Sequence, residues 1–134
     1  MEARLTLVTL AVTDLQRAVR FYRDGLGVPV RSAFPDAVFF RLGGVTLGLY
    51  PRDLLARDAG VAADGSGFRG VTLAHNVATR EEVHRVLEQA AAAGATIVKQ
   101  PRVADWGGYS GYFADPDEHL WEVACAPDGS TDGP

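Results

Sequence analysis

Residues 109–123 carry the sequence Tyr-Ser-Gly-Tyr-Phe-Ala-Asp-Pro-Asp-Glu-His-Leu-Trp-Glu-Val, which is the clearest signal of the fold. Two β-prone runs flank a polar break at residues 115–117. Proline suits the second position of a turn, and aspartate bonds to the backbone just downstream. We therefore predict two strands joined by a tight turn, the second of which carries Glu122 between Trp121 and Val123. Because side chains alternate along a strand, Glu122 points away from both apolar neighbours.

Composition and charge are those of an ordinary globular domain. The chain has 134 residues, 47% of them hydrophobic and 22% charged, with a net charge of −4. There is no block of basic residues, so we expect no nucleic-acid partner. The apolar runs are too short to span a bilayer and the N-terminus does not resemble a signal peptide, so we expect no membrane association. A single cysteine, Cys125, leaves no internal disulfide and predicts a cytoplasmic protein.

The first half of the chain alternates between strand and helix signals. A strand is predicted at residues 5–12 and a helix at 15–23 with Asp14 as its N-cap. Three further strands are predicted at residues 28–32, 37–42 and 45–50. Residues 51–69 are polar and small, and we expect a linker with at most one helical turn. The first half is therefore predicted as a βαβββ module.

The same order of signals returns in the second half. A strand is predicted at residues 71–77, and a capping box from Thr79 to Glu82 opens a helix to about residue 93. A short strand at residues 96–99, closed by Pro101, and the two strands of residues 109–123 complete the module. We predict a single domain over residues 1–134, with modules at about 5–50 and 70–125 and a disordered tail at 127–134.

A duplicated βαβββ module has a consequence for function. One helix covers one face of each sheet, so the other face packs against the second module or encloses a cavity. Ligand sites favour such concave junctions. The predicted fold class is α+β, with two tandem modules whose curled mixed sheets enclose a cavity.

Two stretches carry a resemblance to a known family. Residues 10–27, Leu-Ala-Val-Thr-Asp-Leu-Gln-Arg-Ala-Val-Arg-Phe-Tyr-Arg-Asp-Gly-Leu-Gly, and residues 112–123 resemble the vicinal oxygen chelate superfamily. This group includes glyoxalase I, extradiol dioxygenases, fosfomycin-resistance enzymes and bleomycin-resistance proteins. The resemblance covers nearly all of residues 5–125 and implies a glyoxalase/bleomycin resistance-like fold and a homodimer. One departure is Glu118, at a turn position where the family has glycine, which predicts a strained or altered turn.

The resemblance also implies a position for a divalent metal ion. Metal-dependent members hold one ion with side chains that correspond here to Leu7, Gly48, Val71 and Glu122. Only Glu122 has a side chain that binds metal, because the other three offer no donor atom. We therefore predict no divalent metal and no other cofactor.

Three functions remain open from the sequence. The first is metal-independent binding of a small organic molecule, aromatic or cationic, by Glu122 and a set of candidate residues: His75, Tyr50, Arg41, Trp106 and Tyr109. The second is a lyase, isomerase or dioxygenase-type enzyme in which Glu122 and His75 are the catalytic candidates, with or without metal. The third is a dimerisation module without a small ligand. A solvated Glu122 would remove the basis of the first two.

Overall fold

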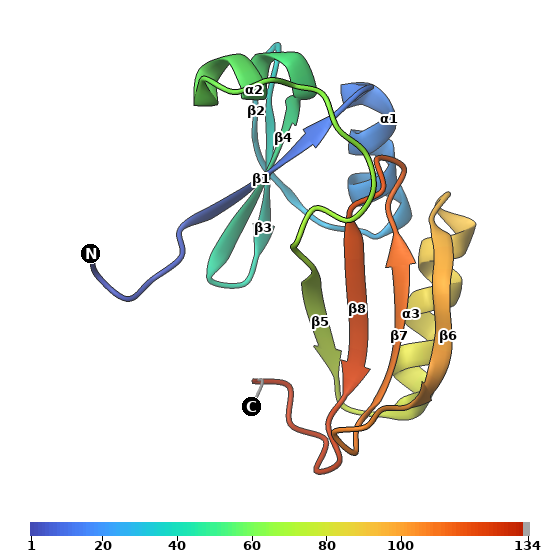
Figure 1. The fold of residues 1–134 in the computed structure, drawn as a ribbon. Coiled ribbons are helices and arrows are strands. Elements are labelled where there is room, and N and C mark those ends of the chain that lie inside the picture. Colours follow the sequence, from blue (N-terminus) through green and yellow to red (C-terminus); the bar gives the residue numbers. More distant parts are fainter. Residues whose placement is uncertain (133–134) are drawn as a thin grey trace. The chain divides into compact units, whose positions relative to one another are not determined.

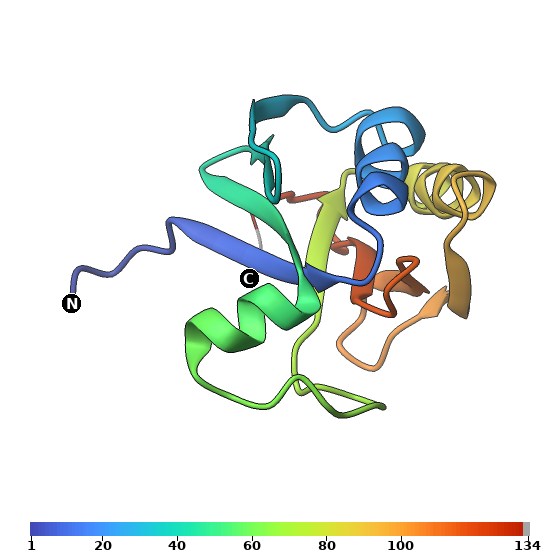
Figure 2. The ribbon, with the colours of Figure 1, turned by 90° about the horizontal axis from the view of Figure 1, so that it is seen from above.

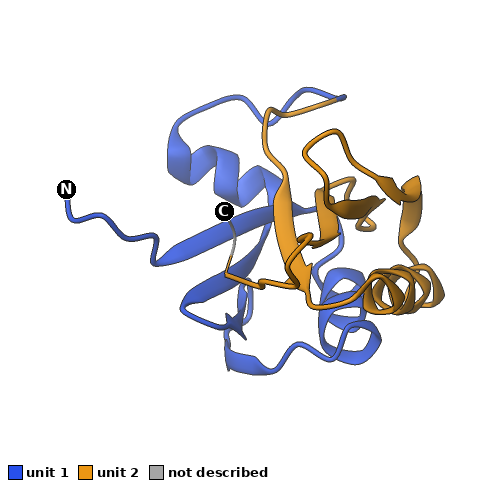
Figure 3. Ribbon diagram, turned by 90° about the horizontal axis from the view of Figure 1, so that it is seen from below, with its two compact units in different colours: residues 1–67 blue, residues 68–134 orange. Residues whose placement is uncertain are grey.

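The computed structural model describes residues 1–132 and divides into two compact units, unit 1 (Met1–Gly67) and unit 2 (from Phe68 onward) (Figure 1; Figure 3). Each unit contains one four-stranded mixed sheet and its own helices. The predicted α+β fold, with a βαβββ order in each half, is confirmed. Both sheets are open, with an edge strand on either side.

Unit 1 contains β1 (Leu7–Val12), α1 (Leu15–Val19), η1 (Arg20–Gly25), β2 (Val30–Ala33), β3 (Val38–Leu42), β4 (Val45–Pro51) and α2 (Arg52–Ala59). Its strand order is β1-β4-β3-β2, with β1 parallel to β4. Asp14 begins α1 as predicted, because its carboxylate accepts a hydrogen bond from the backbone N–H of Arg17 at 3.0 Å. The helix continues without a break into the π-helical η1, so its total length is close to the prediction.

The segment predicted as a linker forms a longer helix than expected. Residues 51–69 include α2, which covers Arg52–Ala59. Gly60 ends the helix with a φ of 72°, a left-handed conformation that costs glycine no steric strain. The Arg52 Nε then donates a hydrogen bond to the carbonyl oxygen of Ala63 at 2.6 Å. This bond ties the chain that follows α2 back to the start of the helix.

Unit 2 contains β5 (Leu73–Val77), α3 (Arg80–Ala92), β6 (Thr96–Val103), β7 (Tyr109–Ala114) and β8 (Leu120–Cys125), in the strand order β5-β8-β7-β6. The predicted capping box is confirmed: Thr79 Oγ1 accepts from the Glu82 N–H at 3.2 Å, and the Glu82 carboxylate accepts from the Thr79 N–H at 3.0 Å. Figure 2 shows α3 end-on beside the strands of its own sheet. Among residues 1–132, no helix has the length and apolar character that crossing a membrane requires.

The strand β6 is longer than predicted. The expected strand ended before Pro101, whereas β6 continues through this residue to Val103. Proline is tolerated because β6 is an edge strand that pairs only with β7. The pairing register also shifts between Lys99 and Arg102, so the ladder is irregular where proline interrupts it.

The turn between β7 and β8 is built around a buried aspartate. Asp115 is almost fully buried, and its Oδ1 accepts hydrogen bonds from the backbone N–H groups of Asp117 at 2.9 Å and His119 at 2.8 Å. Glu118 has a φ of 68° and is the single non-glycine residue among those described with a positive φ. The turn therefore places Glu118 in a conformation that glycine adopts without strain.

The C-terminal tail was predicted to be disordered over residues 127–134. In its described part, the Gly129 N–H donates to the Ala126 carbonyl at 3.0 Å, and the Ser130 N–H donates to Asp128 Oδ1 at 2.9 Å. These bonds form a short turn after β8. Residues 133–134 lie outside the described part of the chain.

Candidate functional site

Glu122 lies in β8, inside the second sheet between β5 and β7. Its strand neighbours Trp121 and Val123 are 8% and 0% exposed on the side of α3. The Glu122 side chain is half-buried on the opposite side of the sheet, as the alternation predicted. We call this side the Glu122 face. The residues paired with Glu122 across the sheet are Ala74 in β5 and Tyr112 in β7.

Tyr112 is the hydrogen-bond partner of Glu122. Its hydroxyl donates to the Glu122 carboxylate. Burial of the phenol raises the pKa of Tyr112 above its usual 10.0, and the charge of Glu122 and the hydrogen bond to it raise this pKa further. On the other side of Tyr112, the Nζ of Lys99 lies 5.7 Å from the centre of the Tyr112 ring. Lys99, Tyr112, Glu122 and Ala74 thus form one row across all four strands.

The register of the second sheet shows which residue lies beside Glu122. The residue beside Glu122 is Ala74, whereas Val71 precedes β5 and is 63% exposed. The methyl group of Ala74 offers no donor atom to a metal ion. Among the described residues, no three His, Cys, Asp or Glu side chains are grouped so that they could hold a metal ion.

The first sheet contains Leu7 and Gly48, the other two residues that correspond to metal ligands of the family. Gly48 in β4 pairs with Thr9 in β1, and two residues earlier on both strands Leu7 pairs with Thr46. A Cβ added at Gly48 would lie 3.1 Å from the Phe39 ring and 3.2 Å from Thr9 Oγ1. The space above Gly48 is therefore taken by the Phe39 ring, which explains the glycine by packing.

His75 does not share a face with Glu122. The strands β5 and β8 run parallel, with Ala74 opposite Glu122 and His75 opposite Val123. His75 is therefore on the side of α3, and it is exposed because β5 is an edge strand. The alternative in which His75 and Glu122 act on one substrate therefore finds the two side chains on opposite faces, because a shift of one residue in register moves a side chain to the other face.

The two aromatic candidates of the β6–β7 region have other contacts. Tyr109 points to the side of α3, where its hydroxyl lies 3.0 Å from His84 Nε2 and its ring centre lies 5.0 Å from the Arg80 guanidinium. Trp106 is exposed and its ring covers Gly108, where an added Cβ would collide with it. Trp106 therefore packs within its own loop, and Tyr109 is separated from Glu122 by the sheet.

Tyr50 and Arg41 belong to the first sheet, in unit 1. Tyr50 is half-buried in β4, and Arg41 is exposed in β3. Their cross-strand partners are Ala11 and Thr46 respectively. By alternation from buried neighbours, both side chains lie on the side of the sheet that carries Gly48.

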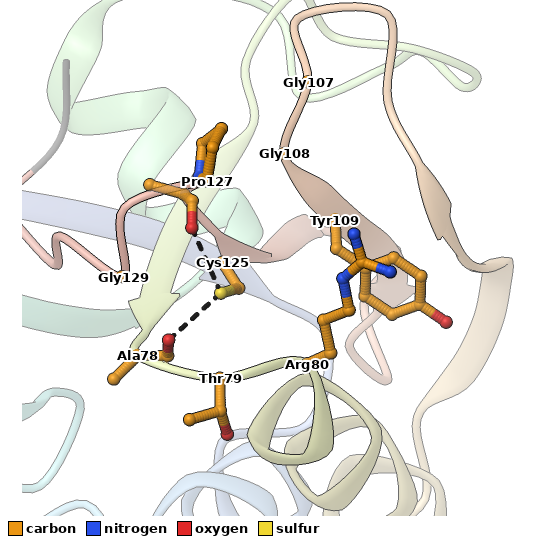
Figure 4. Close-up of a pocket in the computed structure, with 10 residues that line it drawn as sticks. Ala78, Thr79, Arg80, Gly107, Gly108, Tyr109, Cys125, Pro127 and Gly129 are labelled. Atoms are coloured by element: carbon orange, nitrogen blue, oxygen red, sulfur yellow. Dashed lines mark hydrogen bonds between the residues drawn. The ribbon is translucent and has the colours of Figure 1, made fainter.

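Unit 2 also contains a pocket of about 270 Å³ at the start of α3 (Figure 4). Its lining consists of Ala78, Thr79, Arg80, Gly107, Gly108, Tyr109, Cys125, Ala126, Pro127 and Gly129. The buried Cys125 thiol is directed at the carbonyl oxygens of Ala78 at 3.2 Å and Ala126 at 3.3 Å. The Arg80 guanidinium lies over the Tyr109 ring, and the thiol is directed at two carbonyl oxygens, so both of these groups have partners within the pocket wall.

Sequence reasoning missed Tyr112 and Lys99. The signal that identifies Tyr112 is the loop of residues 115–119, which pairs Ala114 with Leu120. Tyr112 and Glu122 each lie two residues further from the loop than this pair, so the same register places them opposite each other. Lys99 has no comparable signal, because the register of β6 against β7 shifts on both sides of Lys99 and its partner cannot be found by counting residues from a turn.

Comparison with known proteins agrees with this architecture. The model of the Glyoxalase/Bleomycin resistance protein/Dioxygenase superfamily matches residues 4–123. A glyoxalase-related enzyme from Fulvimarina pelagi is 33% identical, with a TM-score of 0.84 and 98% of both chains covered. A glyoxalase/bleomycin resistance protein/dioxygenase from Nocardioides is 26% identical, with a TM-score of 0.78 and 100% of this chain and 90% of that chain covered. YraH, an uncharacterized protein of Bacillus subtilis, is 25% identical over 126 residues, which are 90% of this chain and 96% of YraH. The chain therefore belongs to the Glyoxalase/Bleomycin resistance protein/Dioxygenase superfamily.

Proposed function

We propose that this protein binds a small organic molecule and that Glu122 recognises a cationic or hydrogen-bond-donating group on it. The observation that carries this proposal is the half-buried Glu122 carboxylate, which receives a hydrogen bond from Tyr112. A carboxylate has about four acceptor positions, and a single hydroxyl fills one of them. Acceptor capacity therefore remains for a ligand.

The surroundings of Glu122 favour a positively charged ligand group. Among the described residues of unit 2, no basic side chain forms an ion pair with Glu122. Its neighbour Ala74 has only a methyl group, which leaves room beside the carboxylate. A partly buried charge without a counter-charge is costly, and the attraction between opposite charges is stronger there than in bulk water. An amidinium or ammonium group would supply the missing counter-charge.

We also propose that binding needs no divalent metal ion. A catalytic metal centre requires about three protein ligands. The paired positions of the two sheets hold Ala74 with Glu122 and Thr9 with Gly48. Of these four residues only Glu122 has a carboxylate or imidazole, so the residues present do not fit the metal centre of the family.

An enzyme that uses Glu122 and His75 together as acid and base has less support. The two residues lie on opposite faces of one sheet, because His75 pairs with Val123. No single substrate atom can lie within hydrogen-bond reach of both groups, because the sheet separates them.

Benzamidine tests the recognition of charge, with benzamide as a neutral molecule of nearly the same shape. We expect benzamidine to raise the melting temperature, since a ligand at 100 times its Kd adds about 2.7 kcal/mol to the free energy of unfolding. Glu122→Gln should weaken benzamidine binding about tenfold or more, measured by isothermal titration calorimetry. Benzamide should bind about tenfold more weakly than benzamidine.

Glu88→Gln is the matched control, because Glu88 is an exposed glutamate of α3 away from the Glu122 face. It should leave the affinity for benzamidine unchanged. Equal affinity of the wild type and the Glu122→Gln variant would overturn the assignment of Glu122. Elemental analysis of the wild type and of Glu122→Ala tests the proposal that binding needs no divalent metal ion. A stoichiometric transition metal that is present in the wild type and lost in Glu122→Ala would overturn it.

A further inference from the structure

The first sheet has an arginine on the side that faces away from its buried core. Phe40 and Leu47 are almost fully buried, and the ring of Tyr22 in η1 lies 6.1 Å from that of Phe40. By strand alternation, Arg41 in β3 and Thr46 in β4 lie on the opposite side, where they are direct cross-strand partners. We call this side the Gly48 face.

A second arginine reaches the same place from β2. Arg31 is the extra residue of a bulge between Val30 and Ser32, and bulges redirect side chains. Its Nη1 donates a hydrogen bond to Thr46 Oγ1 at 3.1 Å. Because β3 lies between β2 and β4, the Arg31 side chain crosses the strand of Arg41 to make this bond.

The charge at this place is uncompensated within the sheet. Arg31 and Arg41 are the only charged residues of β1, β2, β3 and β4, all of which lie in the described part of the chain. Both are exposed, and the acidic residues of unit 1 lie outside this sheet, in the N-terminal tail, the start of α1, η1, the β2–β3 turn, α2 and the segment after α2. Arg31 binds the hydroxyl of Thr46, the direct cross-strand partner of Arg41. Two like charges brought to neighbouring positions repel each other, and a carboxylate or phosphate between them would remove this repulsion.

An aromatic surface lies next to the arginine pair. Phe39 is two residues from Arg41 on the same face, and its ring covers Gly48. Phe34, from the β2–β3 turn, packs edge-to-face on Phe39 with the ring centres 6.0 Å apart. Phe34 is 59% exposed, so a large apolar surface remains open to solvent beside the two cations.

We infer that the Gly48 face is a binding site for an aromatic carboxylate. The carboxylate pairs with Arg31 and Arg41, the Thr46 hydroxyl donates to it, and the aromatic body covers Phe39 and Phe34. Guanidinium groups match carboxylates in geometry, and aromatic rings stack favourably on exposed phenylalanine. This inference goes beyond the proposed function, because it concerns unit 1 alone and does not require Glu122.

The test uses 2-naphthoate as the probe and the full chain, with binding measured by calorimetry. We expect saturable binding that weakens about tenfold or more in Arg31→Gln and in Arg41→Gln. The neutral 2-naphthamide should bind about tenfold more weakly than 2-naphthoate, and inorganic phosphate should compete only weakly because it has no aromatic body. Phe34→Ala should also weaken 2-naphthoate binding.

Arg57→Gln is the matched control, because Arg57 is an exposed arginine of α2. It should leave the affinity for 2-naphthoate unchanged, as should Glu122→Gln, so that this inference and the proposed function fail independently. Absence of 2-naphthoate binding, or equal affinity for the acid and the amide, would overturn the inference. Equal affinity for 2-naphthoate in the wild type and in both arginine variants would also overturn the inference. Circular dichroism checks that each variant is folded.

Discussion

The hydroxyl of Tyr112 donates a hydrogen bond to the carboxylate of Glu122 from the directly opposite position on the neighbouring strand. By strand alternation both side chains lie on the face of the sheet that no helix of unit 2 covers. The donor role requires a protonated phenol, and burial together with the charge of Glu122 keeps Tyr112 protonated beyond its usual range. Tyr112 is therefore the ionisable residue whose titration reports on Glu122.

The first prediction concerns the ionisation of Tyr112. Its pKa is raised above 10.0 by burial first and by Glu122 second, so Glu122→Gln should lower this pKa but leave it above 10.0. Ultraviolet difference titration of each protein against its Tyr112→Phe counterpart isolates the one tyrosine. An unchanged pKa in Glu122→Gln would contradict the hydrogen bond.

Stability should follow the same ionisation at high pH. A phenol whose pKa is higher in the folded than in the unfolded state stabilises the fold fully below about pH 10. This contribution is lost as the pH rises through the raised pKa of Tyr112. Urea unfolding between about pH 8 and pH 11 should therefore show a steeper loss of stability in the wild type than in Tyr112→Phe. Parallel curves for the two proteins would contradict this expectation.

Replacement of Glu118 by glycine should stabilise the protein. Glu118 has a φ of 68°, which costs a non-glycine residue about 1–2 kcal/mol. Glycine removes this cost and adds about 0.5–1 kcal/mol of unfolded-state entropy, so a net gain of about 0.5–1 kcal/mol is expected. Glu118→Ala is the control, since it keeps the Cβ and the strain. Equal melting temperatures for the glycine and alanine variants would contradict the strained turn.

Replacement of Gly111 by alanine should destabilise unit 2. A Cβ at Gly111 would lie 2.8 Å from Leu87 Cδ1 and 2.8 Å from the carbonyl oxygen of Lys99. The backbone oxygen cannot rotate away, so a loss of about 1–3 kcal/mol in the free energy of unfolding is expected. Gly44→Ala is the control, because no atom lies within 4 Å of an added Cβ there. Similar chemical-unfolding midpoints for the two variants would refute the close packing at Gly111.

Removal of the N-cap of α3 should also cost stability. Thr79 Oγ1 accepts a hydrogen bond from the Glu82 N–H, and alanine cannot replace it. Thr79→Ala should lower the free energy of unfolding by about 1 kcal/mol, whereas Thr79→Ser should retain most of the stability. Thermal unfolding followed by circular dichroism distinguishes the two. An equal loss of stability in Thr79→Ala and Thr79→Ser would contradict the role of the Thr79 hydroxyl as the N-cap.

The sequence predicted what depends on neighbouring residues in the chain. Asp14 and the pair Thr79 and Glu82 cap helices through bonds that span three residues, so their pattern is visible in the sequence. Alternation likewise predicted that Glu122 lies opposite Trp121 and Val123. The extent of β6 was underestimated, because tolerance of Pro101 depends on the strand being at the edge of the sheet.

The candidate site was predicted less well than the fold, because its residues meet only through register. His75 was a candidate to act together with Glu122, but the parallel pairing of β5 with β8 places Ala74 beside Glu122. No turn joins β5 to β8, so nothing local determines their alignment by one residue. The meeting of Arg31 with Thr46 likewise depends on a bulge in β2.

The sequence by itself determined the duplicated βαβββ order, the helix caps and the turn between the last two strands, because each follows from local periodicity and turn chemistry. The superfamily was indicated separately, by the resemblance of residues 10–27 and 112–123 to a known family. Only the tertiary structure decided that Ala74 lies beside Glu122, that His75 is turned to the other face and that Arg31 meets Thr46 on the Gly48 face. The physical reason is that pairing between strands sets which side chains meet. A slip of one residue costs little in local preference yet moves every side chain of the strand to the opposite face.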